Sequence, residues 1–354
     1  MKRVILHSDM NACYASIEAK LNPKLKGIPM AVAGNPENRH GIILAKSEEA
    51  KKMGVKTGEP IWQAQGKCPN LTLVPPHYEE YLKHSKMARA LYYEYTNQVE
   101  PFGLDECYLD VTGSLHLFGS GEEIAHEIRN RMKEELGLTV SIGVSFCKIF
   151  AKLGSDMKKP DAVTIITEDN FKQKVWPLGV REMVGIGKAT EKKLNKIGIF
   201  SLGDLAHAPA ETLKSLLGIN GVYLWQYANG LDIRPIVDRD HTEPIKSIGN
   251  SSTCKRDLHS DEEVFNVMQE LSFSVSRRLR EAKLEARGVE VFVRNNQLQS
   301  WNFAIPLEMA SQSSIILVRR AMEIFKKKYN WSFPVRAVGI RACLLYTSDA
   351  ADER

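Results

Sequence analysis

Short apolar runs alternate with amphipathic stretches through the first half of the chain. Residues 3–9 form an apolar run that ends in Asp9, which predicts a core strand with a carboxylate at its carboxyl end. The following segments are a helix over 12–20, strands over 30–33 and 41–45, helices over 48–53, 60–66 and 78–95, a strand over 99–111 interrupted near Gly103, a helix over 122–136 and a strand over 139–145. The order strand, helix, strand, strand, helix, strand is typical of an α+β sheet with helices on one face, with residues 19–77 inserted.

The pattern changes twice in the second half of the chain. Residues 176–230 are helical and punctuated by glycine, and residues 232–243, with several charges and Arg234-Pro235, predict a linker. The segments beyond it are a helix over 262–286, strands over 288–294 and 301–305, a helix over 314–329 and a strand over 335–342. A mixed α/β module is therefore expected after the linker.

The composition is that of a folded protein with more than one unit. With 354 residues, 43% of them hydrophobic, the chain is long and apolar enough for two to four compact cores. Six scattered cysteines, without a CxxC pair or a Cys/His cluster, are typical of reduced residues in a cytosolic protein. Asp9 and Asn11 interrupt the first apolar run, so no signal peptide is expected. No apolar stretch approaches the roughly 20 residues that span a bilayer, so no membrane association is expected.

Basic residues are concentrated in the last third of the chain. The whole chain has a net charge of +5, whereas residues 244–341 alone carry 16 basic and 10 acidic residues. The remainder is therefore close to neutral. A basic module attached to a neutral body favours a nucleic acid partner, although on charge alone an ordinary solvated surface is an equally good interpretation.

Three acids stand where predicted strands end or bend: Asp9 and the adjacent pair Asp105-Glu106. Nucleotidyl transfer uses two Mg²⁺ ions about 3.5–4 Å apart, and Mg²⁺ prefers hard carboxylate oxygens. Adjacent residues on a regular strand point to opposite faces, so both members of the pair can serve one site only at a strand start or kink, which Gly103 permits. Unrelated surface acids are the alternative, but apolar residues on both sides make the pair a polar break in a buried strand.

Several motifs around these residues occur in a specific order, at residues 7–18, 101–110, 141–145, 150–152 and 156–160. Together they resemble the Y family of DNA polymerases, in its DinB or DNA polymerase IV branch, over about residues 2–342. The resemblance implies an α+β, multidomain right-hand polymerase fold. Its domains are a palm (1–18 and 78–168), small fingers (19–77), a helical thumb with a helix-hairpin-helix (169–231), a linker (232–243), an α/β little finger that binds DNA (244–342) and an atypical tail (343–354).

The resemblance also implies a role for each acid. Asp9, Asp105 and Glu106 would hold two Mg²⁺ ions, for which Mn²⁺ can substitute, with the Met10 carbonyl as a further ligand. Asn11 stands where the family often has a second aspartate, a change of little consequence because the family uses the backbone near that position. The implied reaction adds dNTPs to a primer 3′ end by two-metal-ion nucleotidyl transfer.

Four further residues are expected to contact the incoming nucleotide. Tyr14 falls at the family's steric gate, where a flat ring leaves no room for a ribose 2′-hydroxyl; core packing is the other interpretation. Lys159 matches a triphosphate-binding lysine, whose charge would neutralise the developing pyrophosphate. Ile42 and Leu44 are expected as a hydrophobic roof over the templating base pair.

The fingers depart from the family pattern. The family usually has Tyr and Arg in the segment 47–51, where this chain has Glu48 and Lys51. A glutamate repels a triphosphate, and lysine lacks the bidentate fork of arginine. Lys51 is expected to keep the role more weakly, with Lys46 and Lys56 as candidates to compensate.

Further residues are expected to hold DNA. Gly185 and Gly187, followed by Lys188 and Lys192, resemble a helix-hairpin-helix whose backbone N–H groups approach a phosphate. Lys246 opens the basic module that resembles the little finger.

The expected function is low-fidelity, template-directed translesion synthesis by a bacterial, cytoplasmic and nucleoid-associated monomer, with primer–template DNA and dNTPs as partners. A sliding clamp is expected for native relatives, but residues 343–354 contain no recognisable clamp peptide. Two alternatives stay open. One is a non-catalytic DNA-binding module that retains the hairpin and the basic domain, and the other is a different metal-dependent enzyme on a related palm, such as a nucleotide cyclase.

Overall fold

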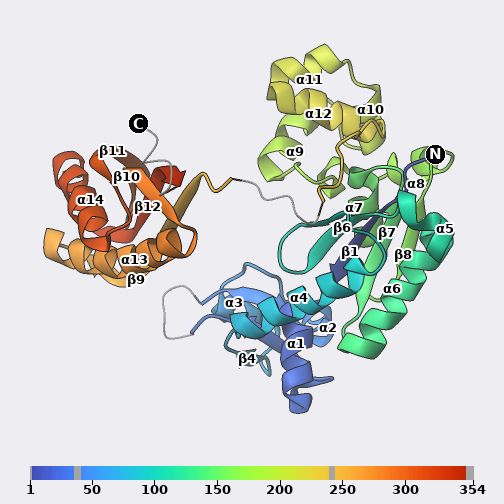
Figure 1. Cartoon of the computed structure of the whole chain (residues 1–354), viewed down its shortest axis with the longest axis horizontal. Helices are drawn as coiled ribbons and strands as arrows, with labels where there is room; N and C mark the ends of the chain where they lie inside the picture. The colour runs from blue at the N-terminus through green and yellow to red at the C-terminus, as the bar shows by residue number, and fades with distance from the viewer. Residues whose placement is uncertain (1, 36–40, 239–243, 348–354) are drawn as a thin grey trace. The chain divides into compact units, whose positions relative to one another are not determined.

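The computed structural model describes residues 2–35, 41–238 and 244–347 (Figure 1). They form two compact units. The first consists mainly of Met1–Gly34 and Ile42–His241, and the second mainly of Thr242–Arg354. Residues 239–243 of the predicted linker and the last seven residues of the predicted tail lie outside the described residues. No helix in the described ranges is long and apolar enough to cross a membrane.

A five-stranded sheet, in the order β5-β6-β1-β7-β8, forms the centre of the first unit. Its strands are β1 (Ile5–Met10), β5 (Val99–Pro101), β6 (Glu106–Asp110), β7 (Val140–Ser145) and β8 (Val163–Ile166). β1 is antiparallel to both of its neighbours, β6 and β7, and all six of its residues are buried. The polar side chains of so buried a strand must find their partners within the protein.

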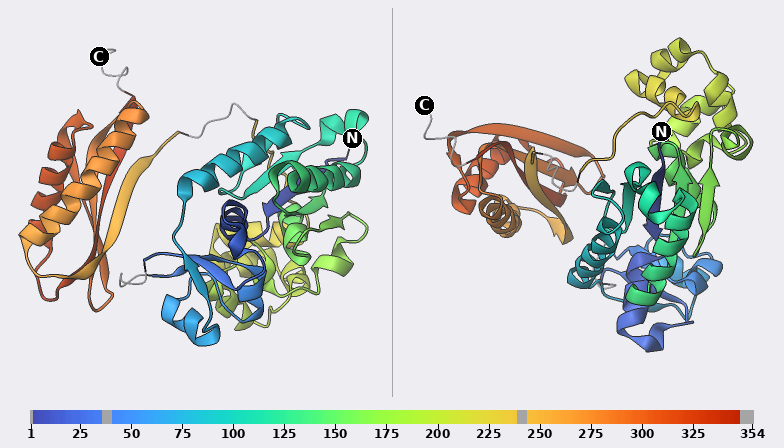
Figure 2. Two further views of the ribbon diagram at one scale, coloured as in Figure 1. Left: turned by 90° about the horizontal axis from the view of Figure 1, so that it is seen from below. Right: turned by 45° about the vertical axis from the view of Figure 1, so that its right-hand side comes forward.

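Helices cover both faces of this sheet, which is seen from two further sides in Figure 2. They are α1 (Cys13–Leu21), α4 (Tyr78–Tyr93), α6 (Gly121–Leu136) and α7 (Lys148–Met157). The short helix η1 (Pro23–Leu25) follows α1, and the short helices η2 (Thr112–Ser114) and α5 (Leu115–Phe118) precede α6. Successive side chains of a strand alternate between faces. Leu6 and Met10 join the core with α1, α4 and α6, whereas Ile5 packs with Ala151 of α7. The prediction of helices on one face is therefore corrected: α7, which the pattern did not reveal, covers the other face.

Gly143 allows α7 to approach β7 closely. A Cβ atom at Gly143 would lie 1.9 Å from the Ala151 carbonyl oxygen and 2.6 Å from the Ser155 backbone nitrogen. His7 of β1 is paired in register with Gly143. The close contact therefore brings α7 alongside the face of β1 that bears His7 and Asp9.

A second sheet, in the order β3-β2-β4, lies within the predicted insertion. Its elements are β2 (Met30–Ala33), β3 (Ile43–Lys46), α2 (Glu48–Lys52), α3 (Ile61–Lys67) and β4 (Thr72–Val74). All but the three-residue β4 were predicted. A separate small core containing Ala31, Ile43 and Ala64 holds these elements together.

The last part of the first unit is helical. Its elements are α8 (Phe171–Val175), η3 (Val180–Glu182), α9 (Lys188–Asn195), α10 (Leu202–His207), α11 (Ala210–Leu217) and α12 (Ile219–Ala228), and their apolar side chains share one core. The first residues of the predicted linker are fixed on the sheet domain. The Asp232 carboxylate accepts the Ile149 N–H at 3.2 Å, and Ile236 is buried with Ile5 and Tyr108.

An antiparallel sheet in the order β11-β10-β12-β9 forms the second unit, with two helices packed on it. Its elements are β9 (Ser247–Leu258), α13 (Asp261–Glu281), β10 (Leu284–Asn295), β11 (Ser300–Ser311), α14 (Ser314–Lys328) and β12 (Val335–Thr347). β9 was not predicted, because its mostly exposed residues lack an apolar period. β12 continues past the predicted end at residue 342, with Leu345 paired to Ala286.

The glycine contact under α7 predicts a large stability difference between two Gly→Ala variants. Gly143→Ala should destabilise the protein by about 2–3 kcal/mol, because the new methyl group meets backbone atoms that cannot rotate away. Gly66→Ala, at an exposed position in α3 with open space around it, should be neutral or slightly stabilising. Thermal denaturation of the two variants tests this, and equal melting temperatures would contradict it.

Candidate active site

Asp9 and Glu106 lie opposite each other on neighbouring strands. Asp9 pairs in register with Glu106, the first residue of β6. Asp105 directly precedes β6, and its carbonyl accepts the Met10 N–H at 2.9 Å. Gly103 has a φ of +93°, so the chain turns just before the acidic pair. This turn lets both members of the pair line one cleft, as predicted.

The cleft has a volume of about 410 Å³. It is lined by Asp9, Met10, Asn11, Ala12, Cys13, Tyr14, Leu44, Ala45, Lys46, Glu48, Lys51, Thr57, Asp105, Glu106 and Lys159. Almost every residue predicted for the metals and the nucleotide is therefore brought together. Ile42 is the exception: it does not line this cleft, is 41% exposed, and forms an isolated bridge with Pro60.

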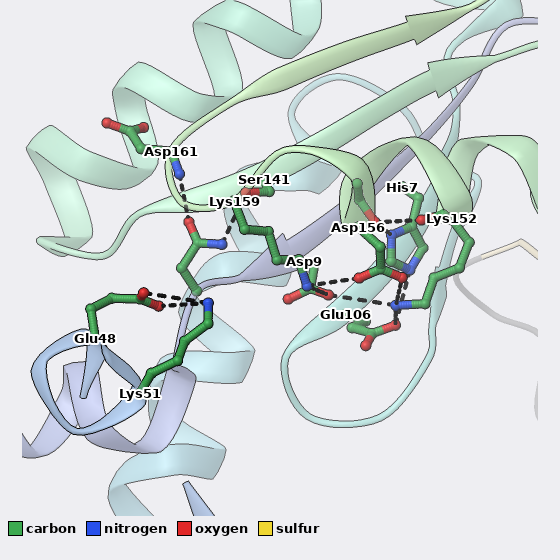
Figure 3. Close-up of polar contacts among 12 residues, drawn as sticks. His7, Asp9, Glu48, Lys51, Glu106, Ser141, Lys152, Asp156, Lys159 and Asp161 are labelled. Atoms are coloured by element: carbon green, nitrogen blue, oxygen red, sulfur yellow. Dashed lines mark hydrogen bonds and ion pairs between the residues drawn. The ribbon is translucent and has the colours of Figure 1, made fainter. Parts of the chain in front are cut away.

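Two lysines bind the acids (Figure 3). The Lys152 ammonium lies 2.8 Å from Glu106 Oε2 and 3.5 Å from Asp9 Oδ2. Lys159 lies 2.7 Å from the same Asp9 oxygen. Asp156 contacts both, at 3.3 Å from Lys152 and 2.8 Å from Lys159. Three carboxylates and two ammonium groups thus form one continuous ion-pair network.

Sequence reasoning gave no role to Lys152 or Asp156. Their spacing on α7 contained a signal, because residues i and i+4 of a helix lie on one face. Lys159 follows three residues after Asp156, so the three charges could have been grouped. Their acidic partners on β1 and β6 could not be identified without the helix itself.

His7 was also missed, and it holds Glu106 from behind. The imidazole is fully buried, with Nε2 3.1 Å from Glu106 Oε2 and Nδ1 2.8 Å from Ser155 Oγ. Burial lowers the pKa of His7, so the ring is neutral near pH 7. Ser155 of α7 thus orients the His7 ring of β1, and His7 in turn orients the Glu106 carboxylate.

The three acids differ electrostatically. Burial raises the pKa of Asp9 despite the lysines beside it, and burial together with the neighbouring Asp9 raises the pKa of Asp105. Burial acts in the same sense on Glu106, but hydrogen bonds from His7 and Lys152 outweigh it and lower the pKa of Glu106 to about 2. Asp105 forms no ion pair within the described residues. Its charge is therefore the least compensated of the three.

The acids have the chemistry of a site for hard divalent cations. Asp9, Asp105, Glu106 and the Met10 carbonyl supply oxygen ligands at one cleft. In the arrangement seen for residues 2–35, 41–238 and 244–347, no three His, Cys, Asp or Glu side chains are placed to hold a metal ion together. The Lys159 ammonium group lies 2.7 Å from Asp9 Oδ2, an oxygen that a metal ion would bind. The carboxylate and carbonyl oxygens of this cleft fit a hard divalent cation in their chemistry.

Asn11 has a structural role that the sequence did not reveal. Its Nδ2 donates to Ser141 Oγ at 2.9 Å, and its Oδ1 accepts the Asp161 N–H at 2.9 Å. An amide can donate and accept at once, which an ionised aspartate cannot. Asn11 therefore ties the end of β1 to β7 and to the loop that carries Lys159.

Tyr14 is half-buried in the cleft wall, and other side chains hold its ring. The ring stacks on Tyr81 with a centroid distance of 4.1 Å and an interplanar angle of 9°, and Tyr78 meets its edge at 5.9 Å. The Tyr81 hydroxyl donates to the buried Glu18, which also contacts His77 Nδ1 at 2.9 Å. The position of the Tyr14 ring is thereby fixed.

Lys51 and Lys46, two cations expected to contact the nucleotide, already have polar partners. Lys51 Nζ lies 3.3 Å from Glu48 Oε2 at the edge of the cleft. Lys46 also lines the cleft and donates to Thr57 Oγ1 at 3.1 Å, and burial with the nearby Lys51 lowers its pKa. Lys56, the other candidate to compensate, does not line this cleft.

The predicted hairpin has suitable backbone geometry. Gly185 has a φ of +94°, and Gly187 is the N-cap of α9. The turn lies between two helical elements, as predicted: the 3-10 helix η3 and the α-helix α9. Lys188 and Lys192 of α9 are exposed, as is Lys246 just before β9 in the second unit.

Comparison with known proteins matches these features to one family. Sequence models of the impB/mucB/samB family match residues 8–156, those of its C-terminal domain match residues 245–353, and the IMS family HHH motif matches residues 168–199. DNA polymerase IV of Acetivibrio thermocellus is 50% identical over 353 residues, which cover 100% of this chain and 88% of that protein. The chain belongs to the Y family of DNA polymerases.

Other relatives agree with this membership. DNA polymerase IV 1 of Bacillus subtilis is 39% identical over 349 residues, covering 99% of this chain and 84% of that protein. A solved Y-family polymerase chimera of Dbh and Dpo4 has a TM-score of 0.86 at 23% identity, covering 97% of this chain and 99% of that chain, a likeness of fold. The chain is accordingly a metal-dependent, DNA-directed DNA polymerase of the DinB branch, which performs low-fidelity translesion synthesis. The alternative of a non-catalytic DNA-binding module is not favoured.

The unequal environments of the adjacent acids predict opposite effects on stability. Asp105→Asn should stabilise the metal-free protein by about 0.5–2 kcal/mol, because it removes a partly buried charge without an ion pair. Glu106→Gln should destabilise it, because His7 and Lys152 lose a charged partner. Thermal denaturation with a chelator at neutral pH tests both.

The pH dependence of the Asp105→Asn effect has a defined sign. A raised pKa destabilises the wild type above that pKa, and the penalty disappears as the pH falls through it. The advantage of Asp105→Asn should therefore shrink on acidification. A constant advantage at all pH values would contradict this assignment.

Proposed function

We propose that Asp9, Asp105 and Glu106 bind two Mg²⁺ ions, with the Met10 carbonyl as a further ligand and with Mn²⁺ as a substitute. The observation that carries this proposal is the convergence of the three acids from two strands on one cleft. When bound, the ions would supply Lewis-acid stabilisation to the attacking and leaving oxygens. The residues of the chain orient this site: His7 holds Glu106, and Asn11 holds the loop that bears Lys159.

Residues around the same cleft would bind the incoming dNTP. Lys159 and Lys51 carry the positive charge for the triphosphate, with Lys46 beside them as the compensating cation. Tyr14 is the steric gate, because a ring fixed from behind cannot yield to a ribose hydroxyl. Leu44 forms the hydrophobic roof, and Ile42 contributes to it only from outside the cleft.

The domains would follow the polymerase hand. The five-stranded sheet with α4, α6 and α7 supports a palm of residues 1–18 and 78–168, and the small sheet supports fingers of residues 19–77. The helices of residues 169–231 form the thumb, residues 232–243 the linker, and the second unit from residue 244 the little finger. Because β12 continues to Thr347, the little finger extends into residues 343–347.

The remaining partners are proposed from charge and exposure. Gly185, Gly187, Lys188 and Lys192 would contact a DNA phosphate at the start of α9, and Lys246 would contact the backbone separately. The enzyme would act as a monomer on primer–template DNA in the bacterial cytoplasm, at the nucleoid. The described part of the chain gives no basis for assigning a clamp contact.

Primer extension tests the assignment of the acids. The wild type should extend a primer with Mg²⁺ and dNTPs on an undamaged template and past a minor-groove guanine adduct. Asp105→Ala should lower the rate by at least about 10²–10³-fold, the scale of losing one preorganised electrostatic group. Template binding, measured by fluorescence anisotropy, should be retained in the variant.

Two outcomes would contradict the proposal. DNA binding without extension by the wild type would favour a non-catalytic DNA-binding protein. Nucleotide turnover that needs no template would instead favour a different metal-dependent enzyme on a related palm.

The Glu48–Lys51 pair predicts a gain of function. Glu48→Gln should lower the KM for dNTP with little change in kcat, because it releases Lys51 to the triphosphate and removes a repelling charge. The pair is substantially exposed, so the effect should be modest and should weaken with added salt. Glu49→Gln, one residue along the same helix, serves as the control. Equal KM values for the two variants would show that Glu48 does not restrain Lys51.

A further inference from the structure

The two lysines of the ion-pair network differ in their freedom to move. The Lys152 side chain is 9% exposed, lies on α7 and contacts three carboxylates. The Lys159 side chain is 29% exposed, follows the end of α7 and lines the cleft. Lys159 can therefore leave its partners by moving into open space, whereas Lys152 is enclosed between the helix and the sheet.

The two lysines also meet at a single oxygen atom. Asp9 Oδ2 lies 2.7 Å from Lys159 and 3.5 Å from Lys152. A third cation cannot join this oxygen without strong repulsion, because like charges at such distances destabilise each other in a partly buried site. Binding of a divalent ion to Asp9 Oδ2 therefore requires one ammonium group to leave, and Lys159 is the one with a path.

We propose that Lys159 is an exchangeable internal cation, which neutralises Asp9 until a divalent metal ion displaces it into the cleft, while Lys152 stays as a permanent counter-charge. The inference rests on the proposed function, since it takes Asp9, Asp105 and Glu106 as metal ligands. Its consequence is an order of events: Lys159 becomes available to an anion in the cleft only after metal has bound to Asp9.

Lysine labelling of the full-length wild type tests the exchange. The protein, without DNA or nucleotide, is acetylated with an amine-reactive ester in chelator or in saturating Mg²⁺, and each lysine is quantified by mass spectrometry. Labelling of Lys159 should rise several-fold with Mg²⁺, while Lys152 stays protected. Lys148, a buried lysine of α7 that pairs with Glu100 at 2.6 Å, is the internal control. Unchanged or reduced labelling of Lys159 would overturn the proposal.

Asp105→Asn separates a failure of the exchange from a failure of the proposed function. Asp105 forms no ion pair with either lysine in the described structure, so the variant keeps the Lys159–Asp9 contact while weakening the metal site. The Mg²⁺-dependent rise in Lys159 labelling should therefore be lost. Mn²⁺ binding is measured in parallel by electron paramagnetic resonance. A wild type that binds no Mn²⁺ contradicts the proposed function, whereas one that binds Mn²⁺ with unchanged Lys159 labelling contradicts only the exchange.

A matched pair of variants tests the permanent counter-charge. Lys152→Met should bind Mn²⁺ several-fold more tightly, because a fixed positive charge beside Asp9 and Glu106 has been removed. Lys148→Met, on the same helix but paired with Glu100, should leave Mn²⁺ affinity unchanged. Unchanged or weaker binding by Lys152→Met would overturn this part. If that variant does not fold, as judged by circular dichroism, the labelling of the wild type decides.

Discussion

The backbone contact between α7 and β7 at Gly143 determines where the charged groups of the site lie. Main-chain atoms of the helix approach the strand so closely that no side chain fits between them. Such a contact is stiffer than one made through flexible side chains. It fixes the height of Ser155 and Lys152 above β1, and with them the partners of His7, Asp9 and Glu106. The electrostatics of the site thus depend on the absence of a single methyl group.

Burial raises the free energy of the ionised carboxylates. The ion-pair network offsets this penalty for Glu106 far more than for Asp105. Glu106 has a neutral imidazole and an ammonium group as partners, which keep it ionised. For Asp105, burial and the negative charges of Asp9 and Glu106 oppose ionisation, and they outweigh its own backbone N–H and the charge of Lys152. Natural proteins depart from favourable local chemistry mainly where function requires it. An acid that the free protein leaves poorly compensated is one that gains most from an added cation.

The sequence predicted what depends on local pattern and left out what depends on packing. The apolar run before Asp9 and the flexible Gly103 before Asp105-Glu106 were sufficient to place the acids, because strand ends and turns have local signals. α7 escaped prediction although Lys148, Lys152 and Asp156 recur at helical spacing. All residues from Lys148 to Ser155 are buried, so its lysines face acidic partners within the protein rather than solvent. β9 escaped for the opposite reason, since most of its residues are exposed.

The lysines that line the cleft share one property that bears on the unusual fingers segment. Lys159 is held by Asp9, Lys51 by Glu48 and Lys46 by Thr57. A triphosphate that enters the cleft must therefore replace the present partner of each lysine that it binds. The Glu48–Lys51 ion pair in the fingers is in this respect like the Asp9–Lys159 ion pair. Under the proposed function, a negative residue beside Lys51 would lower nucleotide affinity without removing the cation. Because the Glu48–Lys51 pair is far more exposed than the Lys159–Asp9 pair, it is also the more easily broken of the two.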